Sequence, residues 1–206
     1  MAKQMDGVTG RLLDCAKNEF LEKGYKDASL RVIAEKANTS TGSIYTRFGD
    51  KGGMFNAIVK STVERFENRF REEIRIFDKM SLMNWEKMLE YTDKQQNILI
   101  DMIYDDFSAY QLLVCHAEGT VFSDFIHNIV EIDVEYTIKY INAIGNDAIV
   151  AKRLTPELLH MLCSSYWSGV FETVVHNMSK EDAAIYICRL KRFFQCGWRD
   201  IFLAVN

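Results

Sequence analysis

The sequence predicts an all-α protein. Its 206 residues include one proline and 11 glycines, so long stretches contain no turn residues. An all-β chain would need such residues about every eight to twelve positions. Apolar residues instead recur at helical spacing. Hydrophobic residues make up 48% of the chain and charged residues 26%, a balance typical of a folded protein with a core.

Three short helices are predicted in the first fifty residues. The first runs from about Thr9, a candidate N-cap, to the stop signal Gly24. Ser29 is the candidate N-cap of the second helix, and the polar residues 38–40 are expected to end this helix. A third helix is expected over residues 41–48. Two short helices around a tight polar break are typical of a helix-turn-helix.

The rest of the chain predicts longer helices and a second domain. Thr155 followed by Pro156 is a typical helix start, and Ser179 offers another cap. The expected helices cover about residues 51–77, 84–104, 106–117, 123–144, 155–177 and 180–203. We therefore expect a helix-turn-helix head over residues 1–50 and an α-helical body over residues 51–206.

Charge is distributed unevenly along the chain. Residues 1–60 contain ten Lys/Arg and seven Asp/Glu, a balance of +3, although the whole chain carries −4. A basic head on an acidic body suits a protein that faces phosphates at one end. Ordinary solvated charge would give the same balance.

The predicted helix-turn-helix has the residues that its geometry needs. Ala34 and Ala37 are small and let the second helix cross the third closely, while Ile33 and Ile44 are expected to fill the angle between them. Small polar residues then occupy the outer side of the third helix, where they let its backbone enter a major groove.

This stretch resembles the signature of the tetracycline-repressor (TetR) family of transcriptional regulators. The matching positions are Phe20, Gly24, Tyr25, Ser29, Ile33, Ala34, Ala37, Ser40, Gly42, Ile44, Tyr45, Phe48 and Lys51. Asn38-Thr39 replaces the usual Gly-Val, and asparagine tolerates the left-handed backbone that glycine would supply. Gly52-Gly53 replaces a helix-favouring pair and is expected to loosen the start of the fourth helix.

The resemblance implies a homodimeric repressor that binds palindromic double-stranded operator DNA and leaves it when a small molecule binds. The residues expected at the DNA are Ser29, Arg31, Thr41, Gly42, Ser43, Tyr45, Thr46, Arg47 and Lys51. Ser29, Tyr45 and Lys51 would contact phosphates, although core packing is an alternative role for Tyr45. Arg47 would contact either a base edge or a phosphate.

The resemblance also implies an effector cavity among the middle helices, for an apolar or amphipathic molecule. The candidate lining residues are Phe66, Met102, Tyr110, Phe125, Asp133, Tyr136, Trp167 and Phe171. Core packing would explain many of these aromatic residues equally well. Asp133 interrupts a mostly apolar face, so it would either orient a cationic or hydroxylated ligand or serve as a hydrogen-bonded structural carboxylate.

Dimerisation is expected through the last two helices. Their candidate interface residues are Ser165, Gly169, Ala183, Ile187, Leu190, Phe194 and Ile201. The apolar members follow a heptad-like spacing, and the small ones allow close helix approach. An intrachain core would give the same pattern.

Several functions are not expected. The chain contains no GxSxG, HExxH or Gly-rich phosphate loop, so we do not expect an enzyme. Its four histidines and five cysteines follow no strong ligand spacing, so we expect no metal and no cofactor. Without a signal peptide or an apolar run of about 18 residues, a cytoplasmic protein that does not enter membranes is expected. A cysteine-based redox sensor on the same fold, or a helical interaction module without DNA binding, remains an alternative.

Overall fold

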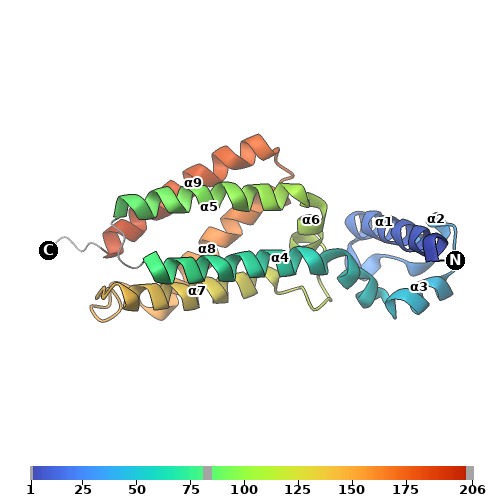
Figure 1. The fold of residues 1–206 in the computed structure, drawn as a ribbon, viewed down its shortest axis with the longest axis horizontal. Coiled ribbons are helices and arrows are strands. Elements are labelled where there is room, and N and C mark those ends of the chain that lie inside the picture. Colours follow the sequence, from blue (N-terminus) through green and yellow to red (C-terminus); the bar gives the residue numbers. More distant parts are fainter. Residues whose placement is uncertain (1, 81–84, 203–206) are drawn as a thin grey trace. The chain divides into compact units, whose positions relative to one another are not determined.

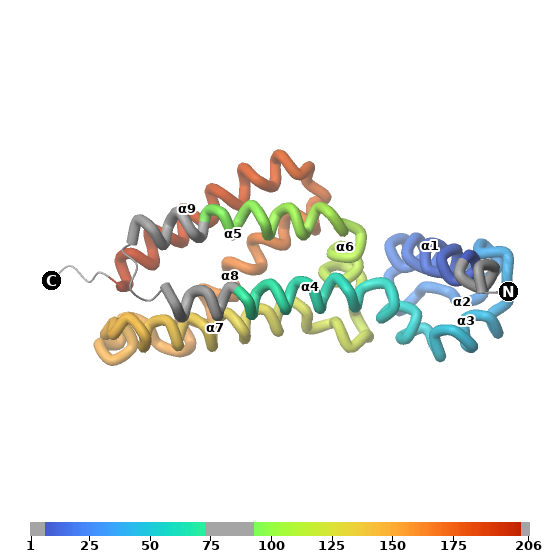
Figure 2. Tube along the Cα trace, viewed as in Figure 1, coloured from blue at the N-terminus to red at the C-terminus, as the bar shows by residue number. Residues whose placement is uncertain are grey.

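The computed structural model describes the backbone of residues 2–80 and 85–202 and the side chains of residues 7–72 and 93–202 (Figures 1 and 2). Every regular element in these residues is an α-helix, which confirms the predicted class. The helices are α1 (Ala2–Asp27), α2 (Leu30–Lys36), α3 (Thr41–Phe48), α4 (Lys51–Met80), α5 (Trp85–Asp105), α6 (Phe107–Cys115), α7 (Phe125–Ala143), α8 (Pro156–Val175) and α9 (Lys180–Phe202). None of them combines the length and hydropathy needed to cross a lipid bilayer.

The start of α1 differs from the prediction. The helix already includes Ala2, and Thr9 lies inside it. The Thr9 hydroxyl accepts a hydrogen bond from Arg47 at 3.2 Å, so this side chain serves a contact between helices. The predicted stop at Gly24 is confirmed, because this glycine adopts a left-handed φ of 73° and interrupts the helical backbone.

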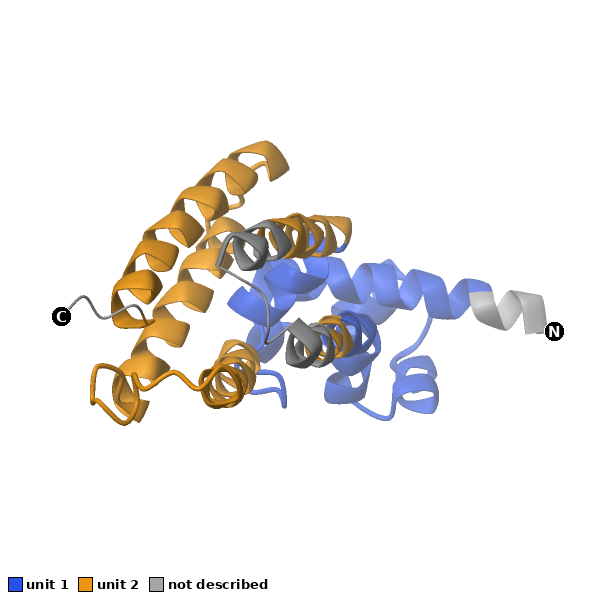
Figure 3. Ribbon diagram, turned by 60° about the vertical axis from the view of Figure 1, so that its left-hand side comes forward, with its two compact units in different colours: residues 1–65, 106–124 blue, residues 66–105, 125–206 orange. Residues whose placement is uncertain are grey.

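The chain forms two compact units, whose boundary differs from the predicted division at residue 50 (Figure 3). The first unit contains residues 1–65 and 106–124, and the second contains residues 66–105 and 125–206. The first half of α4 joins the first unit because Phe55, Val59 and Thr62 are fully buried there.

Aromatic residues build the core of the first unit. The Phe20 and Phe55 rings meet edge to face, with centroids 5.2 Å apart, and Tyr25 packs on Phe55 at 5.5 Å. The same unit contains α6, which packs against α1. This core supports the small helices α2 and α3, which are too short to be stable alone.

In the second unit α7 packs on α8, and α9 packs on α8 and α5. Its core also contains a cluster of aromatic rings. Phe66 lies edge to face with Phe125 and Trp167, with centroids 5.9 Å apart in both pairs. These helices surround the cavity described below.

Candidate nucleic-acid interface and ligand cavity

Local hydrogen bonds fix the two helices of the helix-turn-helix. The Ser29 hydroxyl accepts from the backbone N–H of Val32 and caps α2. Ser40 caps α3 in the same way, through the N–H of Ser43. Between the helices Asn38 adopts a left-handed φ of 53°, as predicted for the residue that replaces glycine. The turn therefore keeps its geometry without glycine.

The outer side of α3 faces solvent. Tyr45 is 54% exposed, and Gly42 and Thr46 are exposed beside it. The Thr46 hydroxyl donates to the Gly42 carbonyl at 2.8 Å, and so lies close to the helix backbone. On the opposite side Ile44 is fully buried and anchors the helix. The high exposure of Tyr45 excludes core packing as its role within this chain.

Arg47 contacts two helices of its own chain. Its Nε donates to the Thr9 hydroxyl on α1, and its Nη1 donates to the Ser43 carbonyl at 3.1 Å and to the Ser43 hydroxyl. Arg47 and Ser43 are both half-buried. These contacts hold α3 against α1, so Arg47 positions the helix. Its contact with a base or a phosphate stays a prediction.

Lys51 also has internal partners. Its ammonium group donates to the Lys26 carbonyl at 2.9 Å and to the Ala28 carbonyl at 3.0 Å. It lies 4.8 Å from the centroid of the Tyr25 ring, a cation–π distance. The residue thus ties the start of α4 to the end of α1. A phosphate contact by Lys51 stays a prediction.

An ion pair between a buried carboxylate and a half-exposed lysine supports α2 and was not predicted from the sequence. Glu19 is only 4% exposed and pairs with Lys36 at 2.9 Å. The same carboxylate accepts from the backbone N–H of Ser29 at 3.4 Å. The only sequence signal was an acidic residue beside Phe20 on the apolar face of the first helix.

The expectation that Gly52-Gly53 loosens α4 is wrong for Gly53. A Cβ atom at this position would lie 1.9 Å from the carbonyl oxygen of Phe48. Only glycine lets the first turn of α4 approach the end of α3 this closely. The Gly53 N–H also donates to the Asp50 carboxylate at 2.6 Å, which caps α4.

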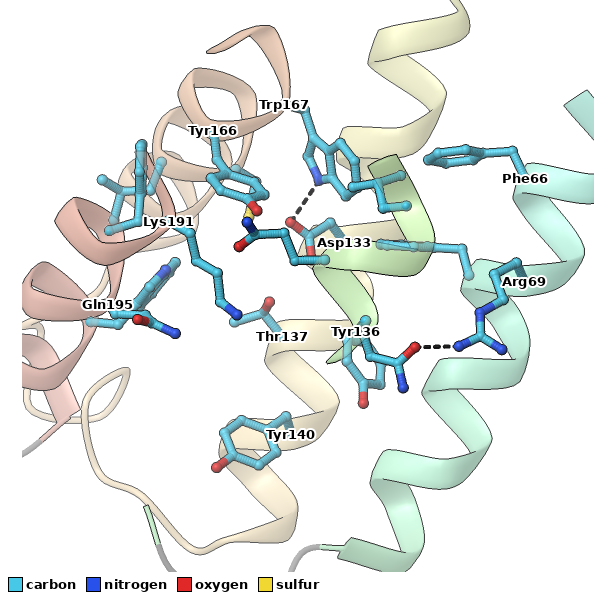
Figure 4. Close-up of a pocket in the computed structure, with 18 of the residues that line it drawn as sticks. Phe66, Arg69, Asp133, Tyr136, Thr137, Tyr140, Tyr166, Trp167, Lys191 and Gln195 are labelled. Carbon is cyan, nitrogen blue, oxygen red and sulfur yellow. Dashed lines mark hydrogen bonds between the residues drawn. The ribbon is translucent and has the colours of Figure 1, made fainter. Parts of the chain in front are cut away.

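The second unit contains a cavity of about 310 Å³, enough for a small organic molecule (Figure 4). Its lining residues are Phe66, Arg69, Phe70, Gln95, Gln96, Leu99, Met102, Asp133, Tyr136, Thr137, Tyr140, Leu162, Cys163, Tyr166, Trp167, Lys191, Phe194, Gln195, Trp198 and Phe202. Five of the predicted lining residues are among them: Phe66, Met102, Asp133, Tyr136 and Trp167.

Charged groups of both signs lie among the aromatic rings. Asp133 accepts a hydrogen bond from the Trp167 indole N–H at 3.0 Å, and burial raises the pKa of its carboxyl group (Figure 4). Lys191 is 7% exposed and pairs with Asp93 at 2.6 Å, while burial lowers the pKa of its ammonium group. The Arg69 guanidinium donates to the Gln95 side chain. The cavity can therefore bind an aromatic body and orient a polar group.

Three predicted lining residues lie elsewhere. Tyr110 belongs to α6 in the first unit and is fully buried there. Phe125 and Phe171 are buried beside Phe66, with centroids 5.9 Å and 6.4 Å from its ring, and do not line the cavity. Both pack on an aromatic ring that does line it, so they belong to its supporting core.

The predicted dimer seam is mostly an intrachain core. Ala183 and Ile187 are fully buried within the chain. A Cβ atom at Gly169 would lie 2.8 Å from the Leu190 side chain, which shows that α8 and α9 approach closely at this point. Phe194 lines the cavity and lies edge to face with Tyr166, with centroids 5.3 Å apart.

Two further predicted interface residues are not part of this core. Ser165 is exposed on α8, and its hydroxyl donates to the Met161 carbonyl. Ile201 is half-buried, and its carbonyl accepts from Arg153. The same two helices also expose large apolar side chains, since Met161 is 57% and Phe193 75% exposed.

Known proteins resemble part of the chain in sequence. Residues 12–58 match the sequence model of the family described as bacterial regulatory proteins, tetR family. The transcriptional regulator UidR of Escherichia coli K12 is 36% identical over 64 residues, which cover 31% of this chain and 33% of UidR. The transcriptional repressor KstR2 of Rhodococcus jostii RHA1 is 32% identical over 74 residues, 34% of this chain and 36% of KstR2. The similarity thus spans about a third of each relative.

Solved structures resemble the whole chain in fold. NalD of Pseudomonas aeruginosa, the secondary repressor of the MexAB-OprM multidrug efflux pump, superposes with a TM-score of 0.59 at 15% identity, over 92% of this chain and 96% of NalD. A second NalD structure gives a TM-score of 0.57 at 17% identity, over 91% and 96%. In sequence, residues 12–58 thus resemble the tetR family of bacterial regulatory proteins, and the chain shares the fold of NalD.

Proposed function

We propose that the chain is a ligand-responsive, DNA-binding transcriptional repressor that reads operator DNA with α3. The observation that carries the proposal is the arrangement of α3, which exposes Tyr45, Gly42 and Thr46 on one side and is anchored by Ile44 on the other. Small residues on the exposed side let a helix backbone approach base edges in a major groove. The proposal requires a cytoplasmic location and no catalytic activity.

The exposed residues take different roles in this proposal. Tyr45 contacts a DNA phosphate through its hydroxyl, and the exposed Arg31 on α2 contacts the DNA backbone beside that phosphate. Thr41 and Thr46 face base edges. Arg47 acts through its contacts with Thr9 and Ser43, which fix the angle of α3.

The cavity of the second unit is the proposed effector site. Its aromatic residues fit a planar or amphipathic molecule, and Asp133 and Lys191 orient polar groups of that molecule. Effector and operator then bind to different conformations of the chain. By linkage, each must weaken the binding of the other by the same factor.

A homodimer is the proposed binding species, because a single short helix makes few DNA contacts. The exposed apolar side chains of α8 and α9, among them Met161 and Phe193, are the proposed contact with the second copy. Two heads about 34–36 Å apart would read the two halves of a palindrome in successive major grooves.

Fluorescence anisotropy of the full chain with a labelled duplex from its own upstream region tests the proposal. Tyr45→Ala should weaken binding while far-ultraviolet circular dichroism stays unchanged, because Tyr45 is exposed. Arg31→Ala should weaken binding to all duplexes and lower the slope of log affinity against log salt by about one.

Lys139→Ala is the matched control, since it removes an exposed positive charge from α7 in the second unit. This variant should bind DNA like the unmodified chain. If neither head variant binds more weakly than the control, α3 is not the DNA-reading element.

A further inference from the structure

Three side chains of types that bind metal ions lie close together on α7 and α8, and none of them lines the cavity. They are His127 and Glu131 of α7 and His160 of α8. One ligand atom of each lies within 4.8 Å of those of the other two. His160 Nε2 is 3.3 Å from Glu131 Oε1, and the two imidazole ring centroids are 6.2 Å apart.

The spacing of these atoms suits a tetrahedral ion. Zinc binds imidazole nitrogen and carboxylate oxygen at about 2.0–2.2 Å, so neighbouring ligand atoms around it are about 3.3–3.6 Å apart. The pair formed by Glu131 and His160 already has this separation. His127 and Glu131 are four residues apart on one helix and therefore share a face. Both are exposed, so rotation of their side chains can close the remaining distance.

We propose that His127, Glu131 and His160 bind one divalent transition-metal ion, with Zn²⁺ as the preferred ion. Two imidazoles and one carboxylate form a ligand set found in zinc sites that keep a fourth position for water. Mg²⁺ and Ca²⁺ are disfavoured because they prefer oxygen ligands, and this cluster offers only one carboxylate. Spacing along the sequence does not reveal this set, because its third candidate ligand lies on another helix.

A metal ion here would connect the two helices that form one wall of the cavity. Asp133 of α7 and Trp167 of α8 line that wall and are hydrogen-bonded to each other. The ion would link α7 and α8 through the exposed cluster of His127, Glu131 and His160. We therefore expect Zn²⁺ to raise the thermal stability of the chain, by an amount that grows with the logarithm of the free Zn²⁺ concentration once this exceeds Kd.

Isothermal titration of the full chain with Zn²⁺ tests the site, after exposed thiols such as Cys115 and Cys196 have been alkylated with iodoacetamide. One ion per chain should bind. His127→Ala and His160→Ala should each weaken binding by about tenfold or more. Co²⁺ bound to the unmodified chain should show the visible absorption that is typical of a Co²⁺ ion with a low coordination number. Both variants should lose this absorption.

His176→Ala is the matched control. His176, the C-cap of α8, is 3.0 Å from Glu172 in an exposed i, i+4 pair, for which no third ligand is placed among the described residues. Its removal should change the zinc affinity less than twofold, which is about 0.4 kcal/mol. If His176→Ala weakens binding as much as His127→Ala, or if neither site variant weakens it, the proposed site is refuted. Circular dichroism of each variant verifies that it is folded.

Discussion

Gly53→Ala perturbs the point where α3 and α4 approach most closely. The added Cβ would lie 1.9 Å from the Phe48 carbonyl oxygen, whereas real Cβ contacts essentially never fall below 3.0 Å. The end of α3 and the first turn of α4 must therefore separate by about 1.1 Å, the difference between these two distances. The substitution should shift the recognition helix as well as destabilise the first unit.

The expected loss follows from two opposing contributions. Alanine favours a helix interior over glycine by about 1 kcal/mol. Overpacking costs about 1–3 kcal/mol, and the upper end applies at Gly53 because the clash is between backbone atoms that cannot rotate away. The free energy of unfolding should therefore fall by about 2 kcal/mol, which lowers Tm by about 4–8 °C in a chain of this size.

Gly52→Ala is the matched control. A Cβ at Gly52 would lie 3.2 Å from Asp50 Oδ1 and 3.4 Å from the Tyr25 hydroxyl. These side-chain atoms need to shift by only a few tenths of an ångström, so Asp50 can keep its hydrogen bond to the Gly53 N–H. The variant should be neutral or more stable by up to about 1 kcal/mol. Thermal unfolding compares the stability of the two variants, and fluorescence anisotropy compares their affinity for DNA. A Gly53→Ala chain as stable as Gly52→Ala would refute the close-approach explanation.

Three further substitutions test other parts of the molecule. Burial raises the pKa of Asp133, so the folded chain disfavours its ionised form, and the folded wild type loses stability as pH rises through this raised pKa. Asp133→Asn should therefore gain stability relative to wild type with rising pH in urea unfolding, and a pH-independent difference would contradict the argument. Phe193→Glu should give monomers in analytical ultracentrifugation, because Phe193 is 75% exposed on the proposed dimer face, whereas Val150→Glu, at an 86% exposed position, should leave the dimer intact. Ser40→Ala removes the cap of α3 and should cost about 1 kcal/mol in chemical unfolding; an unchanged midpoint would show that the cap contributes nothing.

Local signals made the helix-turn-helix predictable. The predicted bounds of α3 agree with the structure, because the residues that begin and end this helix, Ser40 and Gly49, lie next to it in the sequence. Asn38 takes the left-handed conformation for the same reason, since backbone sterics act within a few residues. The wrong expectation in this region, at Gly53, depended on a contact with Phe48 of the preceding helix.

The partners of each apolar helix face depend on tertiary packing and could not be predicted from the sequence. Helical periodicity identifies an apolar face but not what covers it, so the face of Ala183 and Ile187 suited a dimer seam as well as an intrachain core. Tyr110 looked like a cavity residue for the same reason, although it is buried in the first unit. His160 joins Glu131 only through the packing of α7 on α8.

Hydrogen–deuterium exchange of the full chain, with and without duplex from its upstream region, tests the central proposal most directly. If α3 enters a DNA groove, added DNA should slow exchange in peptides that cover residues 41–48 and the start of α2, while α7 exchanges as before. Slower exchange confined to the second unit, with residues 41–48 unchanged, would contradict DNA recognition by this helix.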